Sequence, residues 1–313
     1  MTPINVLSLF DGISCARLAL ERAGVHVNNY FASEIDPYAL LISQRHYPDT
    51  MHLGDVRDIC GCNLPKIDLL VGGSPCQGFS RAGKELNFDD PRSALFFEYV
   101  RILKECDPTY WMLENVPMKK EYRDTISNIL GVEPVQINSS LVSAQSRRRL
   151  YWANFPIQQP VDKGIKLENV VSQDVLIDRD KSHAIIGSIG CTTPREYFHK
   201  NQGQLVYNTI ALSNIYGGLS GSRPRVYVKK FPFVTAGSGR IQLIVNGQPK
   251  DLTITEIKSV TRKLTPLECE RLQTLPDGWT WGASNSQRYK MIGNAWTVDV
   301  IAHILSGLYT EFP

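Results

Sequence analysis

The chain has 313 residues, of which 42% are hydrophobic and 21% are charged, and its formal net charge is +3. A chain of this length and composition buries a sizeable core and forms one large domain or two modest ones, as expected of an ordinary soluble globular protein. No stretch approaches the roughly 18 uninterrupted apolar residues of a membrane span, which excludes a transmembrane protein.

The N-terminal residues and the cysteines limit the class of protein further. The first apolar run, residues 6–10, is interrupted by Asp11 and follows no basic leader, so we expect no export signal. Seven cysteines, an odd number, favour a reducing compartment. Cys60 and Cys62 are too close in sequence for a usual zinc pair, and no second Cys/His pair follows at a suitable spacing. We therefore expect no metal.

Strands and helices are predicted to alternate from the N-terminus onward. Gly24 is a typical helix stop, and Pro37 is typical of a first helical turn. This alternation predicts a parallel sheet with helices on both faces, which is a doubly wound α/β fold. The predicted elements are strands over residues 5–10 and 30–34 and helices over residues 14–23, 37–46 and 93–106.

A cysteine follows the next predicted strand. Residues 69–73 are mostly apolar, which predicts a buried parallel strand, and the small-residue turn Ser74-Pro75-Cys76 comes directly after it. In open α/β sheets, ligands bind just beyond the carboxyl ends of such strands. Most cysteines are small buried hydrophobic residues. The flanking proline and glycine residues favour the other interpretation, that Cys76 is a displayed nucleophile.

An acid and two arginines follow at comparable places. The apolar run 110–113 ends in Glu114, so its carboxylate is expected at the same sheet edge as Cys76. Arg147 and Arg149 come directly before a strand-like run, 150–153. Strand alternation is expected to turn both side chains to one side, where two guanidinium groups suit an anion or a carbonyl oxygen. Taken singly, Glu114 also suits a helix terminus and the arginines suit a solvated surface.

Beyond these elements, Thr265-Pro266-Leu267-Glu268 combines a helix capping box with proline in the first turn, and residues 298–308 form a predicted closing helix. Together the segments resemble the cytosine-C5 DNA methyltransferases over nearly the whole chain. Phe10-Asp11-Gly12-Ile13 and Trp296 resemble the animal de novo enzymes and phage members of that family more than typical restriction-modification enzymes. The matching segments are Phe10-Asp11-Gly12, Glu34, Gly54-Asp55-Val56, Gly73-Ser74-Pro75-Cys76-Gln77, Glu114-Asn115-Val116, Gln145-Ser146-Arg147-Arg148-Arg149, 262–273 and Gly293-Asn294-Ala295.

The resemblance implies a DNA (cytosine-5-)-methyltransferase that uses S-adenosylmethionine and has a Rossmann-like sheet. Cytosine C5 is a weak nucleophile, so Cys76 would first add to C6 of a flipped base. Glu114 would act at N3 and at the exocyclic amine, and Arg147 and Arg149 would steady the O2 side and the adjoining phosphate. Residues 77–90 would form a loop that closes over the base. Ser80, Arg81 and Lys84 in this loop would bind DNA.

The turn after the first strand and Glu34 at the end of the second suggest a nucleoside site, because an acid there accepts hydrogen bonds from both ribose hydroxyls. A dinucleotide dehydrogenase would show a similar acid. Residues 12–16, however, lack the further glycines that a pyrophosphate prefers, so S-adenosylmethionine fits better. For Trp296 a core aromatic is an equally open interpretation. By resemblance, the cofactor-binding residues are Phe10, Asp11, Gly12, Ile13, Glu34, Ile35, Asp55, Val56, Pro75, Asn294 and Trp296.

The middle of the chain differs from its flanks. Residues 160–261 contain 13 Lys and Arg against 8 Asp and Glu, a surplus of +5 that leaves 21 minus 23, or −2, for the rest. A decorated, loop-rich insertion is one interpretation. The resemblance implies a mainly β target-recognition region over 161–261, between a catalytic domain formed by 1–160 and 262–313. Arg223 and Arg225 are its candidate DNA contacts.

The resemblance implies double-stranded DNA as the partner, with a cognate restriction system or a phage genome as its setting, in the cytoplasm of a bacterial or phage-infected cell. Two alternatives remain open. An RNA (tRNA) cytosine-5 methyltransferase would use the same Cys76 and Glu114. A non-catalytic DNA-binding relative is disfavoured by the intact Cys76, Glu114 and Arg149.

Overall fold

The computed structural model describes residues 2–74, 94–187, 192–194, 197–198, 203–216, 226–229 and 240–309. The chain divides into two compact units, the first made of residues 1–139, 148–161 and 295–313 and the second of 140–147 and 162–294. The second unit thus contains all of the predicted recognition segment, 161–261, except Val161, together with residues 140–147 and 262–294. That the two parts divide catalysis from target recognition stays a prediction.

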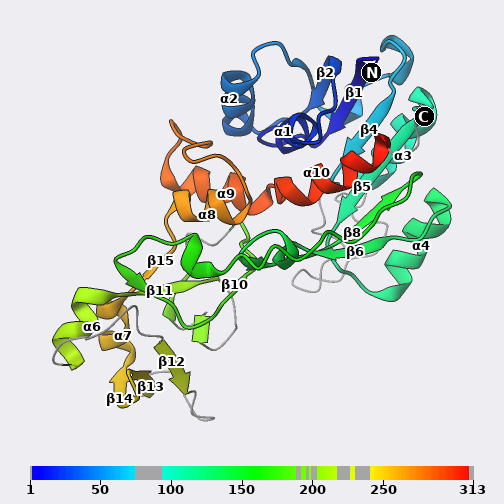
Figure 1. Ribbon diagram of the computed structural model, residues 1–313. Helices are drawn as coiled ribbons and strands as arrows, with labels where there is room; N and C mark the ends of the chain where they lie inside the picture. The colour runs from blue at the N-terminus through cyan, green and yellow to red at the C-terminus, as the bar shows by residue number, and fades with distance from the viewer. Residues whose placement is uncertain are drawn as a thin grey trace. The chain divides into compact units, whose positions relative to one another are not determined.

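The first unit has a seven-stranded sheet with helices (Figure 1). The predicted strands and helices of this unit are confirmed to within a few residues. Its strands and helices are β1 (Ile4–Leu9), α1 (Cys15–Arg22), β2 (Val27–Ser33), α2 (Pro37–His46), β3 (Met51–Gly54), η1 (Val56–Asp58), η2 (Gly61–Asn63), β4 (Leu69–Gly72), α3 (Ala94–Cys106), β5 (Tyr110–Asn115), α4 (Lys120–Leu130), β6 (Val135–Asn138), β8 (Arg148–Ala153), α10 (Val298–Ser306) and η6 (Gly307–Tyr309).

The sheet has the order β3-β2-β1-β4-β5-β8-β6. The chain fills one side of β1 with β2 and β3 and then returns to place β4 and β5 on the other side, and these five strands are parallel. The direction of winding therefore reverses between β1 and β4, which is where doubly wound folds bind ligands. The predicted α/β fold is confirmed, with one addition: β8 runs antiparallel to both β5 and β6, so the sheet is mixed at one edge.

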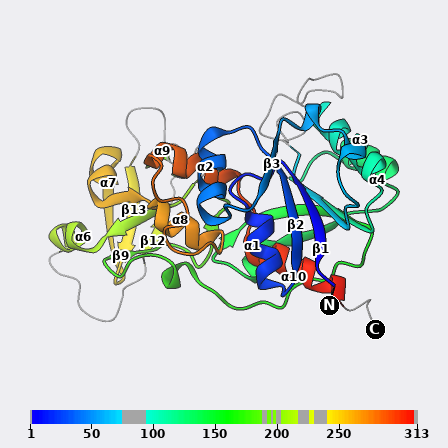
Figure 2. The same ribbon diagram turned by 90° about the horizontal axis from the view of Figure 1, so that it is seen from above.

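Both faces of the sheet are covered. Figure 2 shows α1 and α10 on one side of the strands and α3 and α4 on the other. The side chains of Leu69, Leu70 and Val71 are fully buried, which confirms the predicted buried strand. Because successive strand residues point to opposite faces, this apolar run places buried side chains on both faces of the sheet.

The ends of the first two helices follow from particular residues. Helix α1 begins at Cys15 because Ser14, at φ 61°, lies in the left-handed region. Gly24 adopts a φ of +74° directly after this helix, a conformation that glycine takes at little cost. Helix α2 begins at Pro37, and the side chain of Asp36 accepts hydrogen bonds from the backbone of Tyr38 and Ala39.

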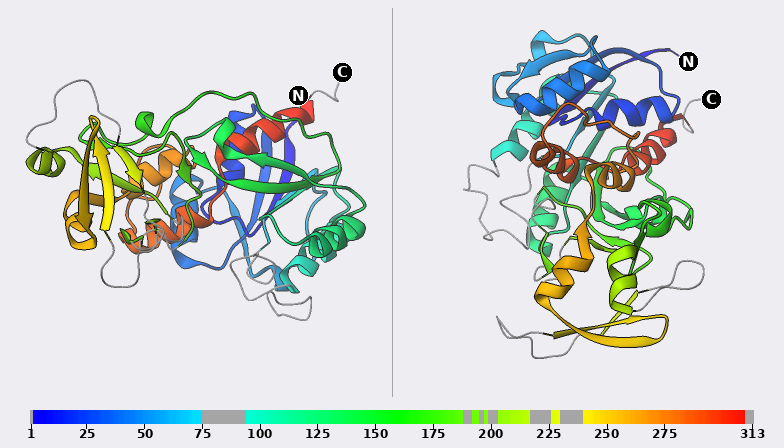
Figure 3. Two further views of the ribbon diagram at one scale, coloured as in Figure 1. Left: turned by 90° about the horizontal axis from the view of Figure 1, so that it is seen from below. Right: turned by 90° about the vertical axis from the view of Figure 1, so that its left-hand side faces the viewer.

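The second unit is built from small sheets and short helices, and Figure 3 shows its β13–β14 hairpin in yellow. Two three-stranded antiparallel sheets have the orders β15-β11-β9 and β12-β13-β14. The predicted capping box is confirmed, because Thr265 and Glu268 exchange hydrogen bonds at the start of α8. The elements are β7 (Gln145–Ser146), β9 (Val175–Leu176), β10 (Ser182–His183), β11 (Leu205–Asn208), α6 (Thr209–Tyr216), β12 (Val226–Lys229), β13 (Arg240–Val245), β14 (Gln248–Thr253), α7 (Ile254–Val260), β15 (Thr261–Lys263), α8 (Pro266–Leu272) and α9 (Asn285–Asn294).

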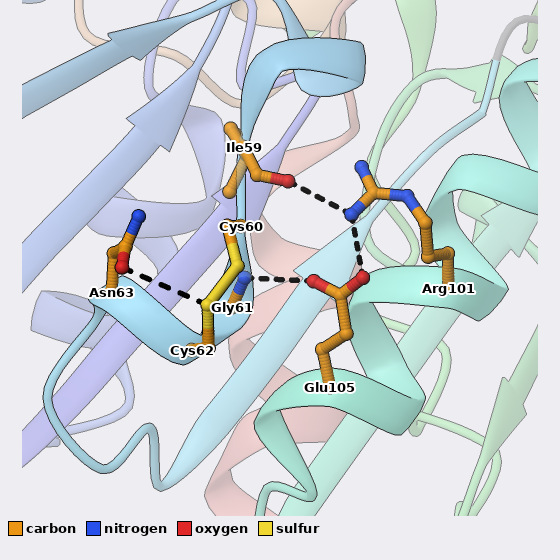
Figure 4. The surroundings of a disulfide bond; sticks show 7 residues. All are labelled: Ile59, Cys60, Gly61, Cys62, Asn63, Arg101 and Glu105. Carbon is orange, nitrogen blue, oxygen red and sulfur yellow. Dashed lines mark hydrogen bonds and ion pairs between the residues drawn. A yellow bond between two sulfur atoms is a disulfide. The ribbon is translucent and has the colours of Figure 1, made fainter.

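The cysteines differ from expectation at one pair. Cys60 and Cys62 form a disulfide across the 3-10 turn η2, with their Cα atoms 5.3 Å apart. Figure 4 shows that the turn is tied to α3, because Gly61 N donates to Glu105 Oε2 at 2.8 Å and Arg101 Nη1 donates to the carbonyl of Ile59. A side chain at position 61 would collide with Cys106 and Glu105, so a glycine is needed between the two cysteines.

In the described part of the chain, no helix has the length and apolar composition needed to cross a membrane. The same residues contain no group of three or more histidine, cysteine, aspartate or glutamate side chains arranged to hold a metal ion.

Candidate active site

The candidate site lies at the carboxyl edge of the sheet in the first unit. The turn after β1, Glu34 after β2, Gly73 after β4 and Glu114 near the end of β5 all lie at this edge, because the four strands are parallel. Gly72 pairs with Leu113, so Gly73 comes beside Glu114. The sequence predicted this shared edge.

The turn after β1 has an unusual backbone. Phe10, Gly12 and Ser14 have φ angles of 59°, 61° and 61°, so alternate residues lie in the left-handed region. Glycine takes this conformation readily, whereas Phe10 and Ser14 adopt it at a cost that the surrounding structure must offset. The amide of Gly12 donates to Glu34 Oε2 at 2.8 Å. The turn therefore holds backbone amides beside the predicted ribose acid.

Asp11 and Ile13 alternate with these three residues along the turn, and their side chains are buried. Asp11 Oδ1 accepts from Tyr30 Oη at 2.7 Å, and Asp11 Oδ2 accepts from Ser14 Oγ at 2.8 Å. Burial raises the pKa of Asp11, and the hydrogen bonds from Tyr30 and Ser14 act in the opposite direction. Ile13 is 1% exposed. Both side chains are buried and stabilise the turn. Any contact of Asp11 or Ile13 with a ligand would therefore be made by its backbone.

Glu34 and Ile35 lie at the end of β2. Glu34 Oε1 accepts from the backbone amides of Ile35 and Asp36 at 2.7 and 2.8 Å, while Oε2 accepts from Gly12. These donors fix the orientation of a partly exposed carboxylate. The Ile35 side chain is 67% exposed, which suits an apolar contact with a planar ligand. The structure brings these two predicted residues together with Gly12.

Asp55 and Val56 follow β3 at the start of η1. Asp55 caps η1 and forms an ion pair with Arg57, and this hydrogen-bonded partner lowers the pKa of Asp55 to about 2. The Val56 side chain is 3% exposed and belongs to the main core cluster. Phe10 packs against the same cluster while remaining partly exposed. The predicted adenine contact of Asp55 and Val56 stays a prediction.

Two residues distant in sequence from Glu114 meet at its carboxylate. Arg149 Nε, on β8, lies 2.9 Å from Glu114 Oε1, and Trp296 Nε1 donates to Glu114 Oε2 at 3.0 Å. The Glu114 and Arg149 side chains are 10% and 14% exposed, so their ion pair is only weakly screened by solvent. Glu114 therefore holds a fixed orientation at the sheet edge. The ion pair with Arg149 was not predicted from the sequence, and the roles predicted for Glu114 and Arg149 at the base stay predictions.

Arg147 differs from expectation. Strand β8 begins at Arg148, so the alternation that would turn Arg147 and Arg149 to one side does not apply. Arg147 belongs to the second unit and is 4% exposed, and its guanidinium donates to the carbonyls of Ile185 and Gly293. Asn294 also belongs to the second unit and is exposed at the end of α9. The roles predicted for both residues stay predictions.

Part of the predicted site lies outside the described residues. This applies to the predicted nucleophile and its loop and to the two arginines of the recognition segment. These residues are Pro75, Cys76, Ser80, Arg81, Lys84, Arg223 and Arg225.

Three residues, Gly73, Tyr30 and Ser43, make supporting contacts that were not predicted from the sequence. A Cβ atom at Gly73 would lie 2.9 Å from both Glu114 Oε2 and Trp296 Nε1, so a larger residue would displace one of these two side chains. Tyr30 holds Asp11, as described above, and Ser14 Oγ lies 2.6 Å from Ser43 Oγ. These contacts join residues distant in sequence, which no local pattern records.

Comparisons with known proteins agree with this geometry. The model of the family described as "C-5 cytosine-specific DNA methylase" matches residues 4–310. The chain is 30% identical to the type II methyltransferase M1.ScrFI of Lactococcus lactis subsp. cremoris, over 95% of this chain and 76% of that protein. It is 26% identical to the orphan methyltransferase M.SPRI of Bacillus phage SPR, over 98% of each chain.

A solved structure supports the fold separately. The Entamoeba histolytica methyltransferase EhMeth is similar to this chain with a TM-score of 0.68 and 17% identity, covering 100% of both chains. At this identity the likeness supports the fold alone. The family match, which spans almost the entire chain, supports more. From it we conclude that the chain belongs to the C-5 cytosine-specific DNA methylase family.

Proposed function

We propose that the chain methylates C5 of a flipped cytosine in duplex DNA through a transient covalent bond between Cys76 and C6. As a family member, the chain is an S-adenosylmethionine-dependent DNA cytosine-C5 methyltransferase. The finer proposal rests on one observation above all. A buried Glu114, oriented by Arg149, lies at the same sheet edge as the amide-bound Glu34. One edge thus offers a group for a base and a group for a nucleoside.

The residues at this edge suit S-adenosylmethionine. A carboxylate has about four acceptor positions, and three backbone amides use only part of this capacity at Glu34. Glu34 would hold the ribose, Ile35 and Phe10 would provide apolar contacts, and Gly12 allows the ligand to approach the backbone closely. S-adenosylmethionine supplies an electrophilic methyl group when bound.

Removing the Glu34 carboxylate is expected to weaken S-adenosylmethionine binding. Loss of charged hydrogen bonds to ligand hydroxyls costs about 1.5–3 kcal/mol, so Glu34→Ala should raise the Kd roughly 10- to 150-fold. Calorimetric titration measures this value, and Glu121→Ala, which removes an exposed acid from α4, is the matched control. DNA affinity without cofactor should hardly change. An unchanged Kd in Glu34→Ala would refute the ribose assignment.

The chemistry explains why these side chains are needed. The Cys76 thiolate adds its electron pair to C6 of the base, which leaves an enamine carbon at C5 that accepts the methyl group. Glu114 stabilises the adduct by holding a proton at N3 and accepting a hydrogen bond from the exocyclic amine. Loss of the C5 proton to a base and departure of the Cys76 thiolate restore the aromatic ring. A stacked cytosine cannot be reached at C6, so the base must leave the helix.

Comparing acceptors distinguishes DNA from RNA methylation. The family description favours DNA, and so we expect transfer of labelled methyl groups to duplex DNA that contains the recognised sequence, with none to tRNA. A mixed genomic DNA serves as substrate, because it supplies many sequences at once. Transfer to tRNA but not to DNA would refute the proposed function.

Since the relatives described above come from a bacterium and a phage, we expect the enzyme to act in the cytoplasm of a bacterial or phage-infected cell, either with a restriction partner or on a phage genome.

We expect residues 161–261 to determine which DNA sequence is methylated. Side chains that read bases must reach their edges in a groove, whereas phosphate contacts only position a protein. Exchanging this segment for that of a relative with another target should therefore transfer the specificity. Arg223→Ala or Arg225→Ala should relax one base preference by about 1–3 kcal/mol if that arginine reads a base, and weaken all sites alike if it contacts phosphate. Methylome sequencing that shows the original target for an active chimera would contradict this assignment.

A further inference from the structure

The indole N–H of Trp296 donates a hydrogen bond. Neither an apolar contact with the cofactor nor a place in the core would require this hydrogen bond. Its Nε1 donates to Glu114 Oε2 at 3.0 Å, across a sequence separation of 182 residues. An indole N–H is a donor only, so it fixes this oxygen as an acceptor. The opposite oxygen of the same carboxylate lies 2.9 Å from Arg149 Nε. Both carboxylate oxygens of Glu114 therefore have a partner, one in Arg149 and the other in Trp296.

The backbone at Gly73 lies directly beside this hydrogen bond. Gly73 passes so close that an added Cβ would lie 2.9 Å from each of the two bonded atoms. A side chain at position 73 would therefore force the Glu114 carboxylate or the Trp296 indole to shift. The Glu114 side chain is only 10% exposed, which limits competition from water for the Trp296 N–H.

Trp296 is itself held by its neighbours. Thr297, the next residue, is 2% exposed, and its Oγ1 lies 2.8 Å from Ser139 Oγ. Val298, the first residue of α10, is fully buried, and α10 packs against α1. Trp296 therefore lies two residues before a packed helix, and buried neighbours of this kind keep a side chain in a narrow range of orientations.

We propose that Trp296 is a positioning residue for the methylation reaction: its indole N–H orients the Glu114 carboxyl group toward the target base. This inference rests on the proposed role of Glu114. It assigns to Trp296 an effect on the chemical step rather than on the affinity for cofactor. A displacement of a reacting group by about 1 Å costs roughly 100-fold in rate, which sets the scale of the expected effect.

The test replaces Trp296 with phenylalanine, which keeps an aromatic ring and removes the N–H. We expect kcat to fall about 10- to 100-fold while the S-adenosylmethionine Kd stays within about 3-fold of the wild-type value. The matched control is Trp152→Phe. Trp152 lies on the same strand as Arg149, and its indole donates to Ser127 Oγ at 3.0 Å, so this variant loses a comparable buried hydrogen bond that does not involve Glu114. It should lose stability and keep kcat.

A second measurement detects the hydrogen bond without any activity. In protein labelled with ¹⁵N-tryptophan, the five indole N–H signals are resolved by NMR, and the Trp296→Phe spectrum assigns one of them. Glu114→Ala should shift the Trp296 signal and leave the Trp152 signal in place. Kinetically, Trp296→Phe should have no further effect on kcat in the Glu114→Ala background, since it acts through that carboxylate.

The outcomes separate the two proposals. Absence of methyl transfer by the wild-type chain would refute the proposed function. Normal wild-type transfer together with a Trp296→Phe kcat within 2-fold of wild type, or with an unmoved Trp296 indole signal in Glu114→Ala, would refute the positioning role. A raised cofactor Kd with unchanged kcat would assign Trp296 to the cofactor pocket instead.

Discussion

Cys76→Ala is expected to abolish methyl transfer to DNA while S-adenosylmethionine binding persists. The thiolate forms the bond to C6 that makes C5 nucleophilic, and an alanine side chain cannot form this bond. Activity should therefore fall by at least about 10⁴-fold, since removal of a nucleophile leaves only binding and electrostatic stabilisation. Initial rates with labelled cofactor and calorimetric cofactor titration measure the two properties separately.

The control for this variant is Cys106→Ala, which removes a partly buried thiol at the end of α3. It should retain wild-type kcat. A direct test of the adduct uses DNA that carries 5-fluorocytosine, because fluorine cannot leave as a proton and the enzyme should stay attached through Cys76. Turnover above a few per cent in Cys76→Ala, or failure of the wild-type chain to be trapped in the presence of cofactor, would contradict the assignment of the nucleophile.

Glu114→Gln should lower kcat by about 10²–10⁴-fold, the range that positioned acid–base groups contribute. The amide preserves the shape of the side chain and cannot give a proton to N3. It also replaces the ion pair with Arg149 by a neutral contact. Single-turnover rates measure the chemical step, and the cofactor Kd should stay close to the wild-type value because Glu114 does not touch the ribose site.

Glu98→Gln provides a matched control for loss of an ion pair. Glu98 is paired with Arg101 on α3 at 2.7 Å, and its side chain is 26% exposed. This variant should lose a little stability and keep its rate, because surface pairs contribute about 0–1 kcal/mol. A Glu114→Gln rate within about 3-fold of wild type would show that this carboxylate does not act on the base.

The fold could be predicted from the sequence where apolar runs are long and bounded by clear stop signals. Residues 69–73 and 110–113 are such runs, and both are buried parallel strands. Strands β3 and β6 have only four residues each, so even the alternation of Val-Gln-Ile-Asn in β6 is too short to stand out in the sequence. The antiparallel direction of β8 depends on its pairing with β5 and β6, which a local pattern does not record.

The site could be predicted where a side chain directly follows a strand. Glu34 and Glu114 were predicted this way, since parallel strands bring their carboxyl ends together. For Arg147 the expected alternation does not apply because β8 begins at Arg148, and the role predicted for this residue stays a prediction. The left-handed Phe10 and Ser14 carry no sequence mark, because neither residue type favours that conformation. The contact of Trp296 with Glu114 depends on the packing of α10.

The position of the transferred methyl group tests the central claim most directly. The purified chain is incubated with genomic DNA and S-adenosylmethionine whose methyl group carries three deuterium atoms, and the DNA is then digested to nucleosides for mass spectrometry. We predict deuterated 5-methyl-2′-deoxycytidine with the wild-type chain and none with Cys76→Ala. Label on N4 of cytosine or on adenine, or an equal yield of labelled product from Cys76→Ala, would contradict the account.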